Sequence, residues 1–487
     1  MRVRRTAIGL VFVLAIAILV PAASSGASAT GWRQKVAPRV LRDTAGGKSA
    51  SFLVLMGSQA DTSMSASFAT KAGKGEFVFS TLRAHADRTQ APVRALLDRL
   101  GARYKSHWDV NLITVLRGDR GLVHTLASRS DVARIETNDW VKSTLLPAKP
   151  AVLAPRSSSP DTVEWNVQKV KAPVVWSHGF TGQGIVVGDI DVGFQWDHPA
   201  LKPHYRGWNG SVADHNYNWY DETNPANRAP VDPNGHGTHT VGTIIGDDGG
   251  TNQIGVAPGA KWIGCRSMNS SGLGTPDTYI GCLEFMIAPW NLDGQNPDPA
   301  KAPVAISNSW YCSISLGECP NQFILLTAVQ NVRAAGIVPV VAAGNSGPIC
   351  QTIGNDGPPA QYDESFTVGA TTQSNTLASF SSRGPVSFQG TRIKPDIVAP
   401  GQTVRSSYPP NTYAVLDGTS MATPHIAGVI ALIYSAKPSL IGNVDATEQL
   451  IENTAQHINS SDCSSNGTFP NNLYGYGFVN AARAAKP

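Results

Sequence analysis

Ile185-Val-Val-Gly-Asp-Ile190 is a short apolar run that continues into Asp191-Val192-Gly193 and sets the architecture of most of the chain. Short apolar runs bounded by Gly or Pro are typical of strands that are buried on both faces of a sheet. Similar runs follow at Trp262 to Cys265, Val304 to Ile306, Ile337 to Val341, Phe366 to Gly369 and Ile397 to Ala399. Helical patterns lie between several of them, such as Leu325, Val329 and Val332 at i, i+4 and i+7. Strands that alternate with helices predict an α/β fold with a mainly parallel central sheet covered on both faces.

Active sites of such sheets lie at the carboxyl ends of the strands, and three polar clusters stand at boundaries of this kind. They are Asp191-Val192-Gly193, Gly235-His236-Gly237-Thr-His-Thr-Val-Gly242, and Gly418-Thr419-Ser420-Met-Ala-Thr-Pro-His425, which opens an apolar helix. A serine hydroxyl is a poor nucleophile until a histidine takes its proton, and the imidazole needs a carboxylate to fix its tautomer. The clusters therefore indicate nucleophilic catalysis by Ser420, with His236 as the base and Asp191 as its orienting acid.

All three clusters resemble signatures of the subtilases, and the chain order Asp, His, Ser is the subtilisin order among triad enzymes. A fourth segment, Val340-Val-Ala-Ala-Gly-Asn345-Ser-Gly347, resembles the one that carries the family's oxyanion asparagine. The resemblance covers roughly residues 161 to 485 and is strongest towards bacillopeptidase-F-like subtilases. It implies a subtilisin-like three-layer αβα fold and a serine endopeptidase. The implied site is the catalytic triad Asp191, His236 and Ser420, with an oxyanion hole formed by Asn345 and the N–H of Ser420.

Some residues of these motifs leave alternatives open. Asp189 shares a strand face with Asp191 at period two and is a rival for the acid, although only Asp191 precedes the glycine that the motif requires. Val192 stands where the family usually has Ser or Thr, so one hydroxyl beside the carboxylate is missing. His239 and His425 also lie inside the motifs, and the family pattern gives them structural roles.

Two segments resemble the edges that pair with the backbone of a substrate. Ser307-Asn-Ser-Trp-Tyr311 resembles the strand beside the specificity pocket, and relatives usually have Gly where Tyr311 stands. The ring of Tyr311 either reshapes the pocket or points outward. A second edge is predicted near Ser267 to Gly274. The residues predicted to bind substrate are Ser309, Trp310, Tyr311, Ser271 and Gly272.

We assign no cofactor and no metal ligand. Subtilases often carry calcium, but Ala200 replaces a commonly used carboxylate, and the loop between Gly246 and Ile254 looks shortened. Calcium binding elsewhere is left open, because several carboxylates could be ligands or simply solvated, and none is identified as a ligand. These carboxylates are Asp214, Asp221, Asp247 and Asp248.

The chain has 487 residues and a formal net charge of +4, a mild excess that does not point to nucleic acid or to an anionic membrane. We expect polypeptide substrates, the chain's own propeptide as a partner, no nucleic acid, no membrane contact after signal removal, and a monomer. Two other classes share parts of the pattern. An inactive binding protein normally loses one of the four site residues, and none is missing here. A serine-carboxyl peptidase would share Gly-Thr-Ser but would not need Gly235 to Gly242.

The N-terminal third predicts export and a removable domain. Residues 1–29 read as a signal peptide, with a basic start, an apolar run of 14 residues from Ala7 to Val20 and a small-residue cleavage site. A membrane anchor is the weaker alternative, because such a run is short for a bilayer core of roughly 30 Å. Residues 30–144 contain a β-α-β-α-β pattern that suggests a ferredoxin-like fold and resembles the inhibitor-type propeptide of subtilases. We therefore expect a secreted proenzyme with a linker at 145–160, a catalytic domain at 161–487 and a mature N-terminus between 145 and 161.

The six cysteines, an even number, suit an oxidising destination such as the cell exterior. Pairing Cys312 with Cys319 would close a short loop. Cys265 with Cys282 and Cys350 with Cys463 would complete one of fifteen possible sets of pairs. Buried free thiols are the alternative.

Overall fold

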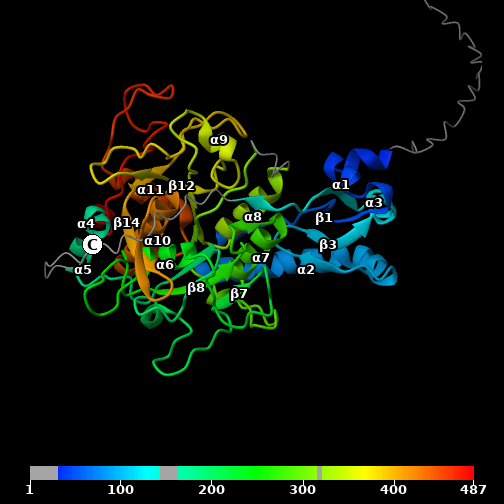
Figure 1. Ribbon diagram of the computed structural model, residues 1–487, viewed down its shortest axis with the longest axis horizontal. Coiled ribbons are helices and arrows are strands. Elements are labelled where there is room, and N and C mark those ends of the chain that lie inside the picture. The colour runs from blue at the N-terminus through cyan, green and yellow to red at the C-terminus, as the bar shows by residue number, and fades with distance from the viewer. Residues whose placement is uncertain (1–30, 143–162, 315–320, 487) are drawn as a thin grey trace, which may run out of the picture.

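The computed structural model describes residues 31–142, 163–314 and 321–486. The predicted signal peptide, the predicted linker and Cys319 lie outside the described residues. The described chain forms a small α+β domain followed by a larger α/β domain, and the two lie side by side (Figure 1).

The small domain is a four-stranded antiparallel sheet with helices on it, in the order β2-β3-β1-β4. Its elements are β1 (Ser49–Met56), α2 (Lys71–Arg99), β2 (Tyr104–His107), β3 (Leu112–Asp119), α3 (Arg120–Ala127) and β4 (Val132–Thr137). This is the ferredoxin-like arrangement that the sequence predicts, but the predicted β-α-β-α-β order is wrong by one strand. The missed strand, β2, is a short edge strand of polar residues, which has no apolar run to reveal it.

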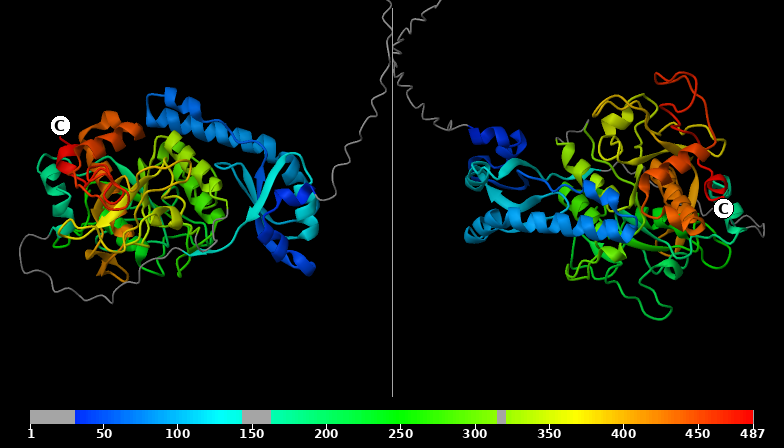
Figure 2. Two further views of the ribbon diagram at one scale, coloured as in Figure 1. Left: turned by 90° about the horizontal axis from the view of Figure 1, so that it is seen from above. Right: turned by 180° about the vertical axis from the view of Figure 1, so that it is seen from behind.

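Helix α2 is the long helix of the small domain, with 29 residues. It begins after Thr70, whose Oγ1 accepts the N–H of Gly73 at 3.1 Å, and it continues through Pro92 to Arg99. Figure 2 shows the helix reaching beyond its own sheet and across the larger domain, where it contacts α8 (Phe323–Ala334). The helix therefore anchors one domain to the other.

The larger domain has a seven-stranded sheet in the order β13-β12-β11-β10-β6-β8-β7, and every pairing in it is parallel. All six predicted apolar runs are strands of this sheet, and β7 is the strand that the sequence patterns missed. The strands are β6 (Val186–Asp191), β7 (Trp219–Asp221), β8 (Lys261–Arg266), β10 (Ala305–Asn308), β11 (Val338–Ala342), β12 (Phe366–Thr371) and β13 (Ile397–Pro400).

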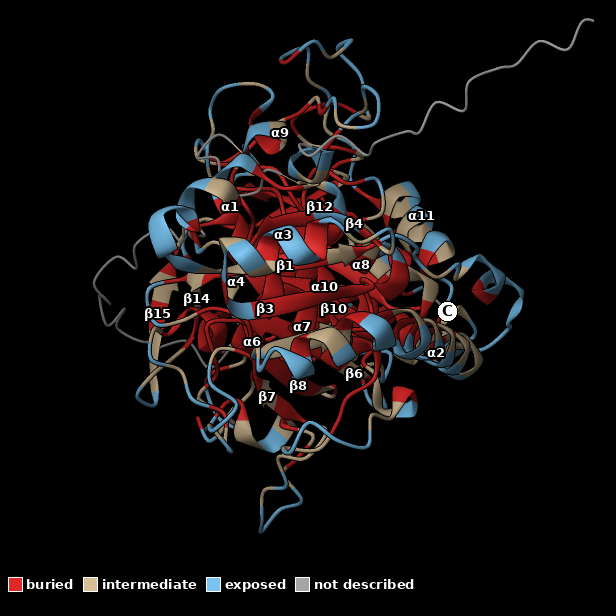
Figure 3. Ribbon diagram, turned by 90° about the vertical axis from the view of Figure 1, so that its right-hand side faces the viewer, coloured by how far each residue is buried: buried red, intermediate tan, exposed pale blue. Residues whose placement is uncertain are grey.

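Helices cover both faces of this sheet, which confirms the predicted three-layer α/β architecture. One buried cluster joins the sheet to α6 (His236–Ile245) and α10 (Thr419–Ala436), and another joins it to α7 (Pro276–Ile287) and α8. Figure 3 shows how little of α10 is exposed, as expected for a helix that is apolar all round. The remaining helices and strands are α1 (Pro38–Asp43), α4 (Trp165–Lys169), α5 (Ala172–Trp176), α9 (Thr352–Asp356), α11 (Val444–Thr454), α12 (Ala481–Ala484), β5 (Val141–Lys142), β9 (Leu273–Gly274), β14 (Val404–Tyr408) and β15 (Thr412–Leu416).

Two of the suggested disulfides are formed. Cys265 bonds to Cys282 and joins β8 to α7, and Cys350 bonds to Cys463 across 113 residues. Cys312 is also disulfide-bonded, so the alternative of free thiols is wrong for the described cysteines. Within the described ranges, no helix is long and apolar enough to cross a membrane.

Candidate active site

The predicted catalytic side chains come from elements that end or begin at the carboxyl edge of the large sheet. Asp191 is the last residue of β6, and His236 is the first residue of α6. Ser420 is the second residue of α10, and Asn345 follows β11 by three positions. The edge at which parallel strands end is where α/β sheets place their ligands.

Asp191 and His236 face each other inside the protein. His236 Nδ1 lies 2.8 and 2.9 Å from the two carboxylate oxygens of Asp191, and the two residues are 6 % and 0 % exposed. Burial lowers the pKa of His236, but the charge and hydrogen bond of Asp191 and the charge of Asp232 outweigh it, so the pKa is raised overall. The backbone N–H of Val192 donates to Asp191 Oδ1 at 2.7 Å, so the carboxylate is held there without a hydroxyl at position 192.

Asp232, which is not among the residues predicted from the sequence, shapes the turn that presents His236. Its carboxylate accepts the N–H of Gly235 at 2.6 Å and both the N–H and the hydroxyl of Thr238 at 3.0 and 2.5 Å. Gly235 has a φ of +99°, and a Cβ there would lie 2.4 Å from the ring of Tyr408, so another residue would be strained and would have to displace that ring. An Asp-Pro-Asn-Gly sequence directly before a helix start was the available signal, because such residues cap helices and build turns.

Asp189, the rival acid, lies in the same strand but makes different contacts. Its Oδ2 accepts the hydroxyl of Thr240 at 2.7 Å, while its Oδ1 has no partner within the described part of the chain. Burial and the nearby charge of Asp191 raise its pKa well above the ordinary range, which favours a neutral carboxyl group. Only Asp191 contacts His236, so the geometry favours Asp191 as the orienting acid.

The two other motif histidines are buried and neutral. His239 Nε2 lies 3.1 and 3.2 Å from the carbonyl oxygens of Val404 and Ala414, and burial and the charge of His236 lower the pKa of His239 to about 3. His425 Nδ1 lies 2.8 Å from Met421 O, and burial lowers its pKa to about 4. Asn166 Nδ2 lies 2.9 Å from His425 Nε2, so each of the two rings links segments that are far apart in the chain.

Ser420 is 4 % exposed at the start of α10. Its Oγ lies 3.5 Å from the carbonyl oxygen of Ser309, and Ser309 Oγ donates to Ser420 O at 3.2 Å. Among the described residues, no hydrogen bond joins Ser420 to His236; such contacts are often loose before substrate binds. The first N–H groups of a helix have no partner inside the helix, so the N–H of Ser420 suits a developing negative charge.

The amide of Asn345 is oriented by Thr419, the neighbour of Ser420. Asn345 Oδ1 accepts the N–H of Thr419 at 2.9 Å and its hydroxyl at 3.0 Å. Because the oxygen end is held against these donors, the Nδ2 end is turned away from Thr419. This is the orientation that a donor to an oxyanion requires.

The first predicted substrate edge is more deeply buried than expected. Trp310 is 1 % exposed, and its ring stacks on Tyr279 with centroids 4.0 Å apart, so only its backbone is left for a substrate. Tyr311 is 4 % exposed, and the alternative that its ring points outward is therefore wrong. Ser309 is also buried and contacts Ser420 as described above.

The second predicted edge is covered by the end of the small domain. Ser271 is exposed and Gly272 is buried at the turn, which leads into β9. Strand β9 pairs antiparallel with β5, with Val141 opposite Gly274. A segment of the small domain therefore makes the backbone pairing that the sequence analysis predicted for a substrate.

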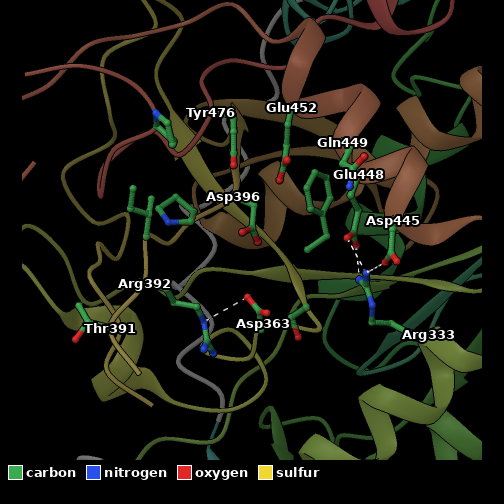
Figure 4. Close-up of a pocket in the computed structure, with 15 residues that line it drawn as sticks. Arg333, Asp363, Thr391, Arg392, Asp396, Asp445, Glu448, Gln449, Glu452 and Tyr476 are labelled. Carbon is green, nitrogen blue, oxygen red and sulfur yellow. Dashed lines mark hydrogen bonds and ion pairs between the residues drawn. The ribbon is translucent and has the colours of Figure 1, made fainter. Parts of the chain in front are cut away.

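Two further features lie outside this constellation. Within the described residues, no group of three or more His, Cys, Asp and Glu side chains is arranged to hold a metal ion. A cavity of about 590 Å³ lies beside α11, away from the candidate catalytic residues. Figure 4 shows ion pairs between residues that line it, Arg333 with Asp445 and Glu448 and Arg392 with Asp363.

A parallel sheet between two layers of helices, with a His–carboxylate pair and a serine at a helix start, defines a class of serine hydrolases. Comparison with protein families places the chain within it: the subtilase family model matches residues 182–477. The chain belongs to the subtilase family of serine endopeptidases.

Similar proteins support the same assignment. The chain is 38% identical to bacillopeptidase F of Bacillus subtilis (strain 168) over 432 residues, which are 85% of this chain and 28% of that protein. It is 35% identical to subtilisin Savinase of Lederbergia lenta over 325 residues, 67% of this chain and 99% of that protein. It is 34% identical to subtilisin E of Bacillus subtilis (strain 168) over 325 residues, 67% of this chain and 72% of that protein. The chain thus spans just over a quarter of bacillopeptidase F but nearly all of subtilisin Savinase.

Proposed function

We propose that the chain is a secreted proenzyme that hydrolyses internal peptide bonds of polypeptides through the triad Asp191, His236 and Ser420. The observation that carries the proposal is that both oxygens of Asp191 face His236 Nδ1 in the interior, while the helix that holds Ser420 contacts both α6 and β6. The relatives named above, among them a subtilisin and bacillopeptidase F, support this direction.

In the proposed mechanism, Ser420 Oγ attacks the carbonyl carbon of the scissile bond while His236 Nε2 takes its proton. Asp191 fixes the tautomer of the imidazole and stabilises its positive charge. The amide of Asn345 and the N–H of Ser420 donate to the oxyanion of the tetrahedral intermediate. His236 then gives the proton to the leaving amine, and water repeats the sequence on the acyl-enzyme to release the acid.

Residues 30–144 act in this proposal as a propeptide that assists folding and blocks the site, and residues 145–160 as the linker where it is cut. The pairing of β5 with β9 supports blocking, because the propeptide occupies an edge expected to bind substrate. A shared apolar cluster, which includes Leu53, Leu82 and Trp108 from the small domain with Ile280 and Leu283 from α7, supports tight association.

A buried group of charges beside that cluster strengthens the association. His107 is completely buried between two carboxylates of α7, with Nε2 2.7 Å from Asp277 Oδ1 and Nδ1 3.1 Å from Glu284 Oε2. The backbone N–H groups of Trp108 and Asp109 both donate to Glu284 Oε1. These bonds give partners to the polar groups of both domains that the association withdraws from water.

Replacing the proposed nucleophile tests the function. Ser420→Ala should abolish casein hydrolysis, leave the propeptide uncleaved and prevent labelling by a fluorophosphonate probe at neutral pH. Ser374→Ala is the matched control, because Ser374 is an exposed serine in the turn after β12 and should leave all three readouts unchanged. Hydrolysis or self-cleavage by purified Ser420→Ala would contradict the mechanism. A wild-type chain that binds peptides but is never labelled would indicate an inactive binding protein. Activity confined to acidic pH would indicate a serine-carboxyl peptidase.

A further inference from the structure

A buried carboxylate lies under the segment that carries Asn345. Asp356 ends α9 and is 3 % exposed. Its Oδ1 accepts the hydroxyl of Ser346 at 2.5 Å, and its Oδ2 accepts the hydroxyl of Ser382 at 2.5 Å. Burial raises the pKa of Asp356 to about 6, although the two hydroxyl groups oppose that shift. A buried carboxyl group without a cationic partner is costly to keep, and such groups gather at functional sites.

Ser382 connects Asp356 by hydrogen bonds to both sequence neighbours of Asn345. Its N–H donates to Gly344 O at 3.0 Å, and its Oγ accepts the N–H of Ser346 at 2.9 Å. Because that Oγ donates its own hydrogen to Asp356, the carboxylate fixes the direction in which Ser382 can accept. The backbone on each side of Asn345 is therefore held by one buried serine, and the serine is held by Asp356.

The contact between Asp356 and this segment is direct as well. Gly344 has a φ of +103°, and a Cβ on it would lie 2.0 Å from Asp356 Oδ2, so the carboxylate packs against the backbone of the turn. From the other side, the Gly344 N–H donates to Thr419 Oγ1 at 3.2 Å, and Thr419 also holds the amide oxygen of Asn345. The turn is thus fixed between the start of α10 and the Asp356 carboxylate.

We propose that Asp356 is a positioning residue for the oxyanion hole, which acts through Ser382 and Ser346 to hold the amide of Asn345 at the place where negative charge develops. The inference rests on the proposed function, because it assumes that Asn345 is an oxyanion donor. A donor works only when it is preorganised within hydrogen-bond distance of the oxyanion, so loosening its support lowers kcat rather than substrate affinity.

The test is a double-mutant cycle in the full chain after self-processing, with enzyme concentration set by the endpoint of fluorophosphonate labelling. Asp356→Ala should lower kcat on a peptide substrate about 10- to 100-fold with KM changed less than about threefold, below the 10²–10³-fold loss of a whole donor. Asp356→Asn, which keeps the shape and one acceptor, should lose less and remains informative if the alanine variant folds poorly. In an Asn345→Ala background, Asp356→Ala should have almost no further effect on kcat, because the group that it positions is gone.

Ser381→Ala is the matched control for a general loss of packing. Ser381 is fully buried next to Ser382, but its Oγ accepts the N–H of Ala370 instead of supporting Asn345. It should leave kcat unchanged, whereas Ser382→Ala should resemble Asp356→Ala. If wild-type enzyme is active and Asn345→Ala lowers kcat, but Asp356→Ala leaves kcat unchanged or lowers it equally in both backgrounds, the inference is wrong and the proposed function stands. If wild-type enzyme neither hydrolyses nor is labelled, or Asn345→Ala leaves kcat unchanged, the assumption itself fails.

Discussion

Among the residues that the structure describes, two buried histidines pair with carboxylates, one in the candidate active site and one between the two domains. His236 has a single carboxylate partner, Asp191, at Nδ1, and no hydrogen bond to its Nε2 is formed by the residues that the structure describes. His107 has a carboxylate at each nitrogen, Asp277 at Nε2 and Glu284 at Nδ1. His236 therefore keeps Nε2 available for proton transfer, whereas both ring nitrogens of His107 are occupied by carboxylates.

The difference shows that a histidine–carboxylate contact does not by itself mark a catalytic site. With acceptors at both nitrogens, His107 must donate twice, so it is an imidazolium that holds the domains together. Burial lowers its pKa, but the charge of Glu284 and the hydrogen bonds to both carboxylates outweigh burial and the charge of Lys105, and the pKa rises to about 9. A base that must release its proton near neutral pH cannot be surrounded in this way.

The largest expected effect distinguishes Asp191 from Asp189, the two candidate acids of β6. Asp191→Asn should lower kcat/KM by about 10⁴-fold, because the imidazole loses the carboxylate that fixes its tautomer. Asp189→Asn should stay within about tenfold of wild type, since the raised pKa of Asp189 favours a neutral carboxyl group, which accepts the hydroxyl of Thr240. Steady-state hydrolysis of a peptide substrate measures both, and the reverse ranking would overturn the assignment of Asp191.

The next effect concerns the second histidine and its partners. Glu284→Ala should shorten the lag between self-cleavage and casein hydrolysis at least about tenfold, because removing one member of a buried charged network costs 2–5 kcal/mol or more at an interface. Three donors at the interface, from His107, Trp108 and Asp109, would lose their acceptor. Glu448→Gln, a change to a glutamate that pairs with Arg333 and not with a charge of the small domain, is the control and should leave the lag unchanged. An equal lag in the two variants would show that the buried charges contribute nothing to inhibition.

The pH dependence of the lag sharpens the comparison further. The pKa of His107 is about 9 in the complex, against about 6.5 for a free histidine, so its contribution is complete below about pH 6.5 and is lost as pH rises through 9. Burial also raises the pKa of both Glu222 and Asp109, so their deprotonation acts in the same direction, whereas Asp277 stays ionised because its pKa is lowered. The charged groups that face His107 are Lys105, Asp109, Glu222, Asp277 and Glu284.

We therefore expect the propeptide to be released faster at pH 9 than at pH 6.5, by up to about 10²-fold, since each unit of pKa shift corresponds to a factor of ten. The measurement is the lag at each pH, corrected for the activity of mature enzyme at that pH. His107→Gln should shorten the lag at pH 6.5 and flatten its pH dependence. A lag that lengthens in alkali would contradict the role given to His107.

The features of the site that could be predicted are those encoded within a few residues. Asp191 follows a buried strand and precedes a glycine, and the surroundings of His236 and Ser420 are fixed by glycines and by the helix that each residue starts. Local signals of this kind survive in the sequence because turn and helix-start geometry restricts residue choice. Six strands of the large sheet were predicted from their apolar runs, whereas the short edge strands β2 and β7 have too few apolar residues in a row and were missed.

The features that could not be predicted are contacts between residues far apart in the chain. His107 contacts Asp277 and Glu284, which are 170 and 177 positions away in the chain, and the sequence around His107 does not predict either carboxylate partner. Asp356 reaches Ser382 across 26 positions from a short helix without a recognisable motif. The burial of Tyr311 likewise depends on what packs over it, so the sequence left two orientations open.

The smallest expected effect comes from His239, which lies one helical turn from His236 and is bonded to carbonyl groups instead of a carboxylate in the described part of the chain. Burial and the charge of His236 hold the pKa of His239 at about 3. Between about pH 6.5 and pH 3, position 239 is therefore protonated in the unfolded chain but neutral in the folded chain, and the free energy of unfolding decreases as the pH falls. The test compares two chains that both carry Ser420→Ala, which prevents self-digestion, one with His239 and one with His239→Gln. Between pH 6.5 and 4.5, the free energy of unfolding measured with urea should fall by about 2–3 kcal/mol more in the chain with His239. The glutamine keeps a donor for the carbonyl groups of Val404 and Ala414 but does not titrate. His178→Gln, a change to an exposed histidine, should match wild type at both pH values, and an equal loss in all three chains would mean that His239 is protonated in the folded protein.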